Sequence, residues 1–281
     1  MAGEMGVTEI AASSQALISS IVQDVLKAKA QLLPTVMDYS SMVGPGDKSV
    51  AINKRTQFTQ ETKAENTDFT KQVLTFSADT IALTDHEGTY AVLEDIAKFQ
   101  SKPNVVAEIA SEMAAELAKD IDDKILVQLK LASSSAPDHI LDYIDTAGDV
   151  IALGDIANAR YLLNVQNVPF EDRWLIASPK KESELLQIDN FRNANLYGSR
   201  EALLNGEIGS IYGFRVLVHP SLADDDTLFY HKSHVGFARQ MEPTFESDRH
   251  LASASTEFLM QNLYGSKVLD SGLRGVYYSG V

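Results

Sequence analysis

The chain has 281 residues, 44% of them hydrophobic and 22% charged, which is typical of a globular protein and excludes a disordered, collagen-like or coiled-coil chain. Its 24 Lys and Arg residues stand against 39 Asp and Glu residues, so the formal net charge is −15. Such an acidic chain is a poor candidate for wrapping a nucleic acid, because that affinity comes mainly from Lys and Arg. The absence of Cys excludes disulfides, thiolate metal sites and Cys nucleophiles.

The N-terminal segment has neither the basic leader nor the apolar core of a secretory signal, and no apolar run approaches the roughly 20 residues that span a bilayer. We therefore expect a soluble protein that is made in the cytoplasm. Residues 8–33 carry apolar side chains at steps of three to four, which predicts an amphipathic helix that ends before Pro34. This helix either packs on its own domain or forms an arm on a neighbouring subunit.

Residues 50–83 have strand-like flanks, but their middle, 54–71, is almost entirely polar and rich in Thr. Thr favours an extended backbone, so we predict a long two-stranded hairpin with arms of about 15 residues that reach about 50 Å. A hairpin this polar cannot bury itself and is marginal alone. It either needs a partner surface or is an unpartnered surface insertion. The candidate interface residues are Arg55, Phe58, Glu61, Lys63, Glu65, Asp68, Phe69 and Lys71.

Residues 103–131 carry an apolar side chain at every fourth position from Val105 to Leu129, which predicts a long helix. Steps of four make the apolar stripe wind around the helix, so the helix should meet different neighbours along its length. The segment 150–240 then alternates helices and short strands, and the chain is strand-rich from about 252 onward. This order predicts an α/β or α+β segment inserted between two parts of a second domain.

Motifs for catalysis are missing from the sequence. It has neither a phosphate-binding Gly-rich loop nor a nucleophile elbow. His231 and His234, the only close His pair, would lie on opposite faces of a strand. The run Asp224-Asp225-Asp226 lacks the later Gly and Glu of a calcium loop. We therefore predict that the protein is not an enzyme and has no cofactor and no metal site.

Several passages in the second half resemble the major capsid proteins of tailed bacteriophages. They are Leu162–Pro169 with its Asn-Val-Pro ending, Arg173–Pro179, Asn205–Val216, Leu228–Ala238 and Tyr264–Val268. Their order and spacing match that family, although His234 stands where a small residue is commoner. The family-motif positions with a structural role are Pro169, Pro179, Gly206, Gly209, Gly213, Phe214 and Gly265.

The resemblance implies an α+β fold of the Hong Kong-97 type, with an N-terminal arm, an extended β-hairpin, a long spine helix in a peripheral domain and an inserted axial domain. In this sequence these parts are expected at 1–47 for the arm, 48–85 for the hairpin loop, 86–149 for the peripheral domain with its spine helix at 103–131, 150–240 for the axial domain, and 241–281 for the C-terminal strands of the peripheral domain.

The resemblance also implies a function: a major capsid protein that self-assembles into hexamers and pentamers of an icosahedral shell around double-stranded DNA, without sequence-specific DNA binding and without a membrane. Its hairpin is expected to lie across a neighbouring subunit. The implied partners are further copies of itself, scaffolding and portal proteins, and a decoration protein. The implied location is the virion capsid, after synthesis in the host cytoplasm.

Some features and alternatives stay open. The sequence shows no acidic helical extension of the fused-scaffold type, which implies a separate scaffolding protein or none. Lys54, Lys63 and Lys71 lie near the hairpin, but their positions do not assign a covalent crosslink. The nearest alternative is an encapsulin-like bacterial nanocompartment shell. The alternative from another class is a cytoplasmic α/β enzyme or small-molecule-binding protein.

Overall fold

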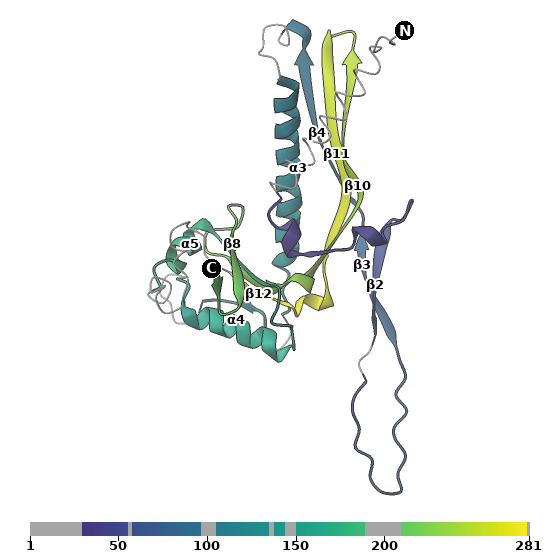
Figure 1. Cartoon of the computed structure of the whole chain (residues 1–281), viewed down its shortest axis with the longest axis vertical. Coiled ribbons are helices and arrows are strands. Elements are labelled where there is room, and N and C mark those ends of the chain that lie inside the picture. Colours follow the sequence, from purple (N-terminus) through teal and green to yellow (C-terminus); the bar gives the residue numbers. More distant parts are fainter. Residues whose placement is uncertain are drawn as a thin grey trace, which may run out of the picture.

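The structure is a computed structural model. It describes residues 30–55, 58–96, 105–134, 138–143, 150–188 and 209–279. The molecule is elongated: a long helix lies along a long sheet, a smaller unit sits beside the lower end of that helix, and a loop extends downward away from the sheet (Figure 1). The helix predicted at 8–33 lies outside the described residues up to position 29.

The long helix is α3, Val105–Leu129, which confirms the helix predicted at 103–131. Its apolar residues at steps of four, such as Met113, Leu117 and Ile121, are buried. They share one core with Phe258 and Met260 of the long sheet and with side chains of the smaller sheet. The winding of the apolar stripe therefore lets one helix bind both sheets.

The long sheet has four strands in the order β1-β10-β11-β4. Their bounds are Met37–Asp38 for β1, Val235–His250 for β10, Ser255–Val268 for β11 and Asp85–Glu94 for β4. The segment predicted to be strand-rich from about 252 onward begins with β11, which is one continuous strand. It pairs with β4 without any irregularity, whereas its register with β10 shifts twice between Arg239 and Thr244.

The smaller sheet has six strands in the order β5-β12-β9-β6-β8-β7. Their bounds are Ile140–Leu141 for β5, Gly275–Tyr278 for β12, Thr227–His231 for β9, Arg173–Ala177 for β6, Phe214–Val218 for β8 and Ser210–Ile211 for β7. The position of β12 corrects the sequence-based expectation that 241–281 lies wholly beside the long helix. The strand pairs with β9 and β5 because the chain crosses back after β11.

Two helices cover one face of the smaller sheet: α4, Leu153–Val165, and α5, Pro179–Leu185. They lie in the segment 150–240, which was expected to alternate helices and short strands. Between them and the sheet lies a second apolar core, in which Phe214 and Phe229 meet edge to face at 5.2 Å. The short 3-10 turns are Leu33–Thr35, Ser40–Met42, Lys232–His234 and Asp270–Gly272.

The predicted hairpin exists, but its paired part is shorter than expected. Strands β2, Ser49–Arg55, and β3, Phe76–Ala82, form a two-stranded antiparallel ladder, and its last pair among the described residues is Arg55 and Phe76. From 58 to 75 the chain has no regular strand and turns back near Asn66, whose φ is 62°. The prediction of two paired arms of about 15 residues each was therefore wrong.

Candidate assembly surfaces

The base of the hairpin packs firmly on the long sheet. Val50, Ile81 and Leu83 form a small core with Ala238 of β10. Gly265 of β11 lies so close that a Cβ there would be 1.9 Å from the Ala82 carbonyl oxygen. This family-motif glycine is therefore required by the close approach of the hairpin to the sheet.

A cluster of opposite charges ties the hairpin to the segment before β12. The Lys54 ammonium forms ion pairs with both Asp79 and Asp270, and Arg274 forms another with Asp270. The Asp270 N–H also donates to Asp79 Oδ2 at 3.0 Å. Partial burial lowers the pKa of Lys54, but its bonds to the two carboxylates outweigh that effect, so the pKa lies above its ordinary value. Lys54 thus holds the hairpin base as a cation.

Beyond this base the loop 58–75 is exposed along its whole length. Side chains rather than a backbone ladder join its two arms. Thr59 N–H donates to Gln72 Oε1 at 2.9 Å, and Gln72 Nε2 donates to the Thr59 carbonyl at 2.6 Å. Nearer the tip, Glu61 accepts from the N–H and the hydroxyl of Thr70 at 2.8 and 2.7 Å. These hydrogen bonds lower the pKa of Glu61.

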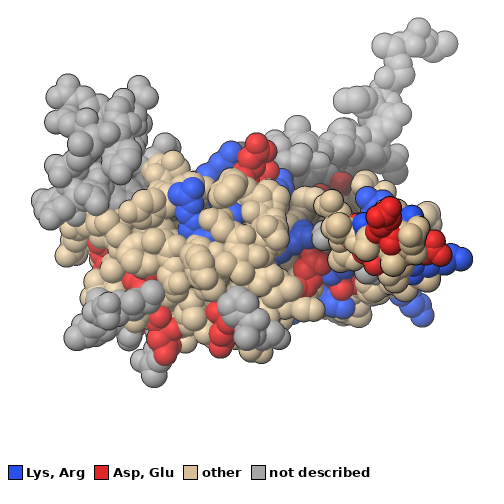
Figure 2. All heavy atoms as spheres, turned by 90° about the horizontal axis from the view of Figure 1, so that it is seen from below, with Lys and Arg blue, Asp and Glu red and all other residues tan. Residues whose placement is uncertain are grey.

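The structure locates all eight candidate interface residues on this loop or on the strand end that leads into it. Glu61 meets Thr70, and the Lys63 ammonium lies 5.8 Å from the Phe69 ring centroid. The described contacts do not bring the eight together into one cluster. Seen from below, Lys, Arg, Asp and Glu side chains are interspersed at the loop tip (Figure 2). The eight residues, all exposed, are Arg55, Phe58, Glu61, Lys63, Glu65, Asp68, Phe69 and Lys71.

The family-motif residues of the smaller unit shape its turns. Pro179 opens α5 behind the N-cap Ser178, and the Pro169 carbonyl accepts from Arg173 Nε at 2.8 Å. Gly213 has a φ of 86° in the turn between β7 and β8, which glycine adopts without strain. Gly209 borders this turn, and Gly206 lies outside the described residues.

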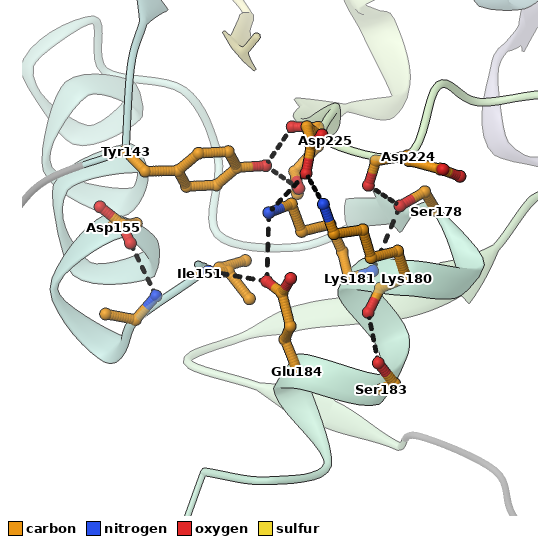
Figure 3. A network of polar contacts seen from close by, with 12 residues as sticks. Tyr143, Ile151, Asp155, Ser178, Lys180, Lys181, Ser183, Glu184, Asp224 and Asp225 are labelled. Atoms are coloured by element: carbon orange, nitrogen blue, oxygen red, sulfur yellow. Dashed lines mark hydrogen bonds and ion pairs between the residues drawn. The ribbon is translucent and has the colours of Figure 1, made fainter. Parts of the chain in front are cut away.

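A charged network lies inside the smaller unit (Figure 3). Lys181 is fully buried, and its Nζ lies 3.1 Å from Glu184 Oε2 and 3.4 Å from Asp225 Oδ1. The Tyr143 ring centroid is 4.4 Å away, and the Tyr143 hydroxyl donates to the Asp225 carbonyl at 2.9 Å. The buried charge of Lys181 is therefore compensated by carboxylates of its own chain, and removing either carboxylate would leave it uncompensated.

A buried carboxylate anchors the segment that leads out of the N-terminal region. Asp122 of α3 accepts from the N–H groups of Gln31 and Leu32 at 2.8 and 3.1 Å, and His219 Nε2 lies 3.5 Å from it. Nearby, the Thr35 and Tyr230 hydroxyls are 2.7 Å apart. This anchor links the N-terminal segment, the long helix and the smaller sheet at one point. Sequence reasoning missed it, because no spacing rule relates residues 31 and 122.

The His pair that the sequence singled out is split. His231 Nδ1 lies 2.7 Å from Ser233 Oγ, whereas His234 is fully buried beside the end of α3. Burial lowers the pKa of His234 to about 4, against a weaker opposing effect of the Leu129 carbonyl. Among the described residues there is no group of three or more His, Asp or Glu that could hold a metal ion. Within the same residues, no helix combines the length and apolar character needed to cross a membrane.

Comparison with known proteins gives a consistent result. The family model described as phage capsid protein matches residues 54–258. No curated protein sequence matches the chain. A structure from Mycobacterium phage Che8 matches with a TM-score of 0.73 and 20% identity, over 87% of this chain and 89% of that chain. The cyanophage Pam1 capsid matches with a TM-score of 0.72 and 11% identity, over 89% and 92%.

A virus-like particle from Pyrococcus furiosus also matches, with a TM-score of 0.62 and 12% identity over 92% of this chain and 96% of that chain. At such low identities the structural matches establish the fold. They confirm the α+β fold of the Hong Kong-97 type that the sequence motifs predicted.

Proposed function

The chain belongs to the phage capsid protein family, and from this premise we propose that it is the major shell protein of a tailed phage. In this proposal it assembles into hexamers and pentamers of an icosahedral shell that encloses double-stranded DNA. Family and fold point to a structural protein, so association rather than catalysis is its mechanism.

One observation carries the proposal: the loop 58–75 is ordered by its own side-chain bonds yet buries nothing within its chain. Two of its aromatic side chains, Phe58 and Phe69, are 66% and 64% exposed. Large apolar side chains that stand in water on a protruding element are typical of a surface that another molecule covers. A neighbouring copy of the chain is the partner that a shell supplies.

The contacts of such a shell are heterologous, because the loop of one copy meets a different surface of the next. Heterologous contacts close into rings when the rotation between copies allows it. Each contact is small, but many of them together hold the shell by avidity. We further propose scaffolding, portal and decoration proteins as partners, and the virion capsid as the site of function after synthesis in the host cytoplasm.

The direct test is the size of the assembled protein. Purified chain, alone and with a co-expressed scaffolding protein, is examined by sedimentation velocity and negative-stain electron microscopy. Capsomers or megadalton shells are expected. A 30.7 kDa monomer under every condition would refute the shell function.

A second variant tests the loop itself. Replacing residues 56–75 by Asn-Gly closes the ladder between Arg55 and Phe76 with a two-residue turn, which suits a tight hairpin. Because the removed loop contributes nothing to the core, the monomer should unfold at the same temperature while assembly is lost. Normal shells from this variant would show that the loop is a dispensable insertion.

The nanocompartment shell stays as a second candidate, favoured by the match to the Pyrococcus virus-like particle over 92% of this chain and 96% of that chain. Both readings give shells of the same fold, so particle size does not separate them. Nuclease treatment of intact particles does: DNA that survives inside supports the phage capsid, whereas particles that contain a protein cargo and no protected DNA support the nanocompartment.

A further inference from the structure

A cavity of about 340 Å³ opens where three parts of the chain meet. Its wall comes from the base of the hairpin, from the end of α4 and from the segment that leads into β12. The lining residues are Lys54, Gln166, Asp270, Ser271, Leu273 and Arg274. Binding sites for small molecules start at about 300 Å³, so this cavity has room for a small ligand.

The two cations of the wall have hydrogen-bond donors to spare. Lys54 carries three N–H groups, and its described partners are Asp79 and Asp270. Arg274 carries five N–H groups, and its described partners are Ser233 Oγ and Asp270. Among the contacts of the described residues, both cations therefore keep N–H groups that an acceptor from outside the chain can use.

Two neutral donors complete the wall. The Ser271 hydroxyl and the Gln166 side-chain amide have no hydrogen-bond partner among the described residues. Ser271 is exposed and Gln166 is half-buried, so both side chains can turn toward a ligand in the cavity. Asp270 is the one carboxylate in the lining, and Lys54 and Arg274 already share it. Donors on four side chains around one engaged carboxylate favour a ligand that brings acceptors.

The cations around the cavity outnumber the carboxylates, although the whole chain has a net charge of −15. Burial lowers the pKa of the neighbouring His231, and the charges of Arg274 and Arg173 lower it further. The cations in and around the lining are Lys54, Arg173, Lys267 and Arg274, and the carboxylates are Asp79, Asp172 and Asp270. An anion in the cavity would therefore meet a local excess of positive charge.

The wall segment 270–272 has a strained backbone. Asp270, Ser271 and Gly272 all have a positive φ, of 51°, 53° and 77°. The left-handed conformation costs a residue other than glycine roughly 1–2 kcal/mol and usually occurs at single residues. Here the turn directs Asp270 to Lys54 and Arg274 and places Ser271 in the lining. Strain of this kind concentrates at ligand-binding sites and switch regions, which is an indication of a ligand independent of the donors.

We propose that the cavity binds an oxyanion, a phosphate or carboxylate group, with Lys54 and Arg274 as its charged donors and Ser271 and Gln166 as its neutral ones. Such a group has several acceptor oxygens, and hydrogen bonds between ionised partners are the stronger ones. The bound anion would link the hairpin base, through Lys54, to the end of α4, through Gln166. The whole site lies within one copy, so this proposal goes beyond the shell function and does not depend on it.

Titration calorimetry of the unassembled chain with inorganic phosphate, at constant ionic strength, tests the site. We expect one saturable site per chain. Lys54→Met and Arg274→Met should each weaken phosphate binding about 10-fold, because each removes a charged donor. Lys48→Met and Arg249→Met are the matched controls, since both residues are exposed and lie outside the lining. The controls should leave the affinity unchanged.

The sign of the effect at Asp270 separates an anion site from a purely structural ion pair. Asp270→Asn removes the carboxylate that competes for Lys54 and Arg274, and Asn tolerates a positive φ. This variant should bind phosphate about fivefold more tightly, because one like-charge repulsion is lost. Ser271→Ala keeps every ion pair and should weaken binding about fivefold.

Three results would overturn the proposal. They are the absence of saturable phosphate binding, an equal affinity in the unmodified chain and in both Met variants of the lining, and weaker binding in Asp270→Asn. Each is measured on the unassembled chain, so a failure of the shell function, seen as the absence of particles, stays distinguishable from a failure of the anion site.

Assembly in different salts separates two sources of the anion. Particle yield is compared in phosphate and in chloride at equal ionic strength, with phosphate at a concentration that saturates the cavity. If a carboxylate of a second copy occupies the cavity, phosphate displaces it and lowers the yield. If a free oxyanion is the ligand, the yield in phosphate is equal or higher.

Discussion

The smaller sheet unit and the loop 58–75 contain the same kinds of side chain in opposite circumstances. In the unit, Phe214 is fully buried against Phe229, and the Lys181 charge meets two carboxylates of its own chain. In the loop, Phe69 is 64% exposed, and the Lys63 ammonium lies 5.8 Å from its ring centroid. The difference teaches that side chains of the unit are buried and paired within one copy, whereas those of the loop are exposed, as the proposed contact with a second copy requires.

The strongest test of this contrast is a matched pair of Phe→Ala substitutions. Phe214→Ala should lower the free energy of unfolding by about 3–5 kcal/mol, because it leaves a cavity in a packed core. Phe69→Ala should change it by less than about 0.5 kcal/mol, because the side chain is already solvated. Urea unfolding of the unassembled chain measures both values.

For Phe69→Ala, the effect on particle yield should be large although the effect on monomer stability is small. Phe69→Ala is expected to reduce assembly while the monomer stays intact. A loss of monomer stability in Phe69→Ala comparable to that in Phe214→Ala would mean that the loop is part of the chain's own core, and the contrast would fail.

The fully buried His234, which lies beside the end of α3, should make the stability of the folded chain sensitive to acid. The folded chain binds a proton on His234 only near pH 4, whereas an ordinary His binds it near pH 6.5. Protonation thus favours the unfolded state. The stability that depends on neutral His234 is present above pH 6.5 and lost as the pH falls toward 4, by roughly 3 kcal/mol for a shift of this size.

Urea unfolding at pH 7 and pH 4.5 measures this loss, with His234→Phe as the test and the exposed His250→Gln as the control. His234→Phe should lose less stability between the two pH values than the unmodified chain, and His250→Gln should lose as much as it does. Identical losses in all three chains would place the acid sensitivity elsewhere.

The base of the hairpin packs against the long sheet, and a substitution at Gly265 tests how close that packing is. Gly265→Ala would bring a Cβ within 1.9 Å of the Ala82 carbonyl oxygen, so the hairpin or β11 must shift. We expect a loss of about 1–3 kcal/mol, as for overpacking elsewhere. Gly209→Ala is the control, since nothing lies within 4 Å of a Cβ there. Equal thermal unfolding of the two variants would contradict the close packing.

The smallest effect is expected at the charge cluster above the loop. Lys54→Met keeps the apolar stem but removes the ion pairs with Asp79 and Asp270. Partly exposed pairs contribute little, so the loss should be at most about 1 kcal/mol and should vanish in 1 M salt. Lys48→Met, an exposed lysine on the same hairpin, is the control. A large, salt-independent loss would show that these charges are structural in their own right.

The sequence could predict a structural feature when the residues that cause it lie close together along the chain. The long helix follows from the spacing between Val105 and Leu129, which is local information. The fold type was identified by a resemblance in the order of the sequence motifs, and not by a physical argument from the residues.

Features made by distant residues were out of reach. Strand β12 joins the smaller sheet through β9 and β5, and the Asp270–Asp79 bond joins residues 191 positions apart. The Thr-rich arms suggested a ladder, but the side chains of Glu61 and Gln72 bridge the arms instead. Whether the eight charged and aromatic residues of the loop and its strand end form an interface stays a prediction, because the structure holds a single copy of the chain.

The charge cluster at Lys54 has a mechanical consequence. The ten residue steps from Phe76 to Asn66 span roughly 33 Å at about 3.3 Å per residue, so the hairpin acts as a lever, and the ion pairs of Lys54 with Asp79 and Asp270 lie at its base. A rotation of about 5° at that base would move the tip by about 3 Å, close to one residue of strand register. If the loop tip contacts a neighbouring copy as proposed, small adjustments among these three side chains would change the angle between copies, and with it the curvature of the shell.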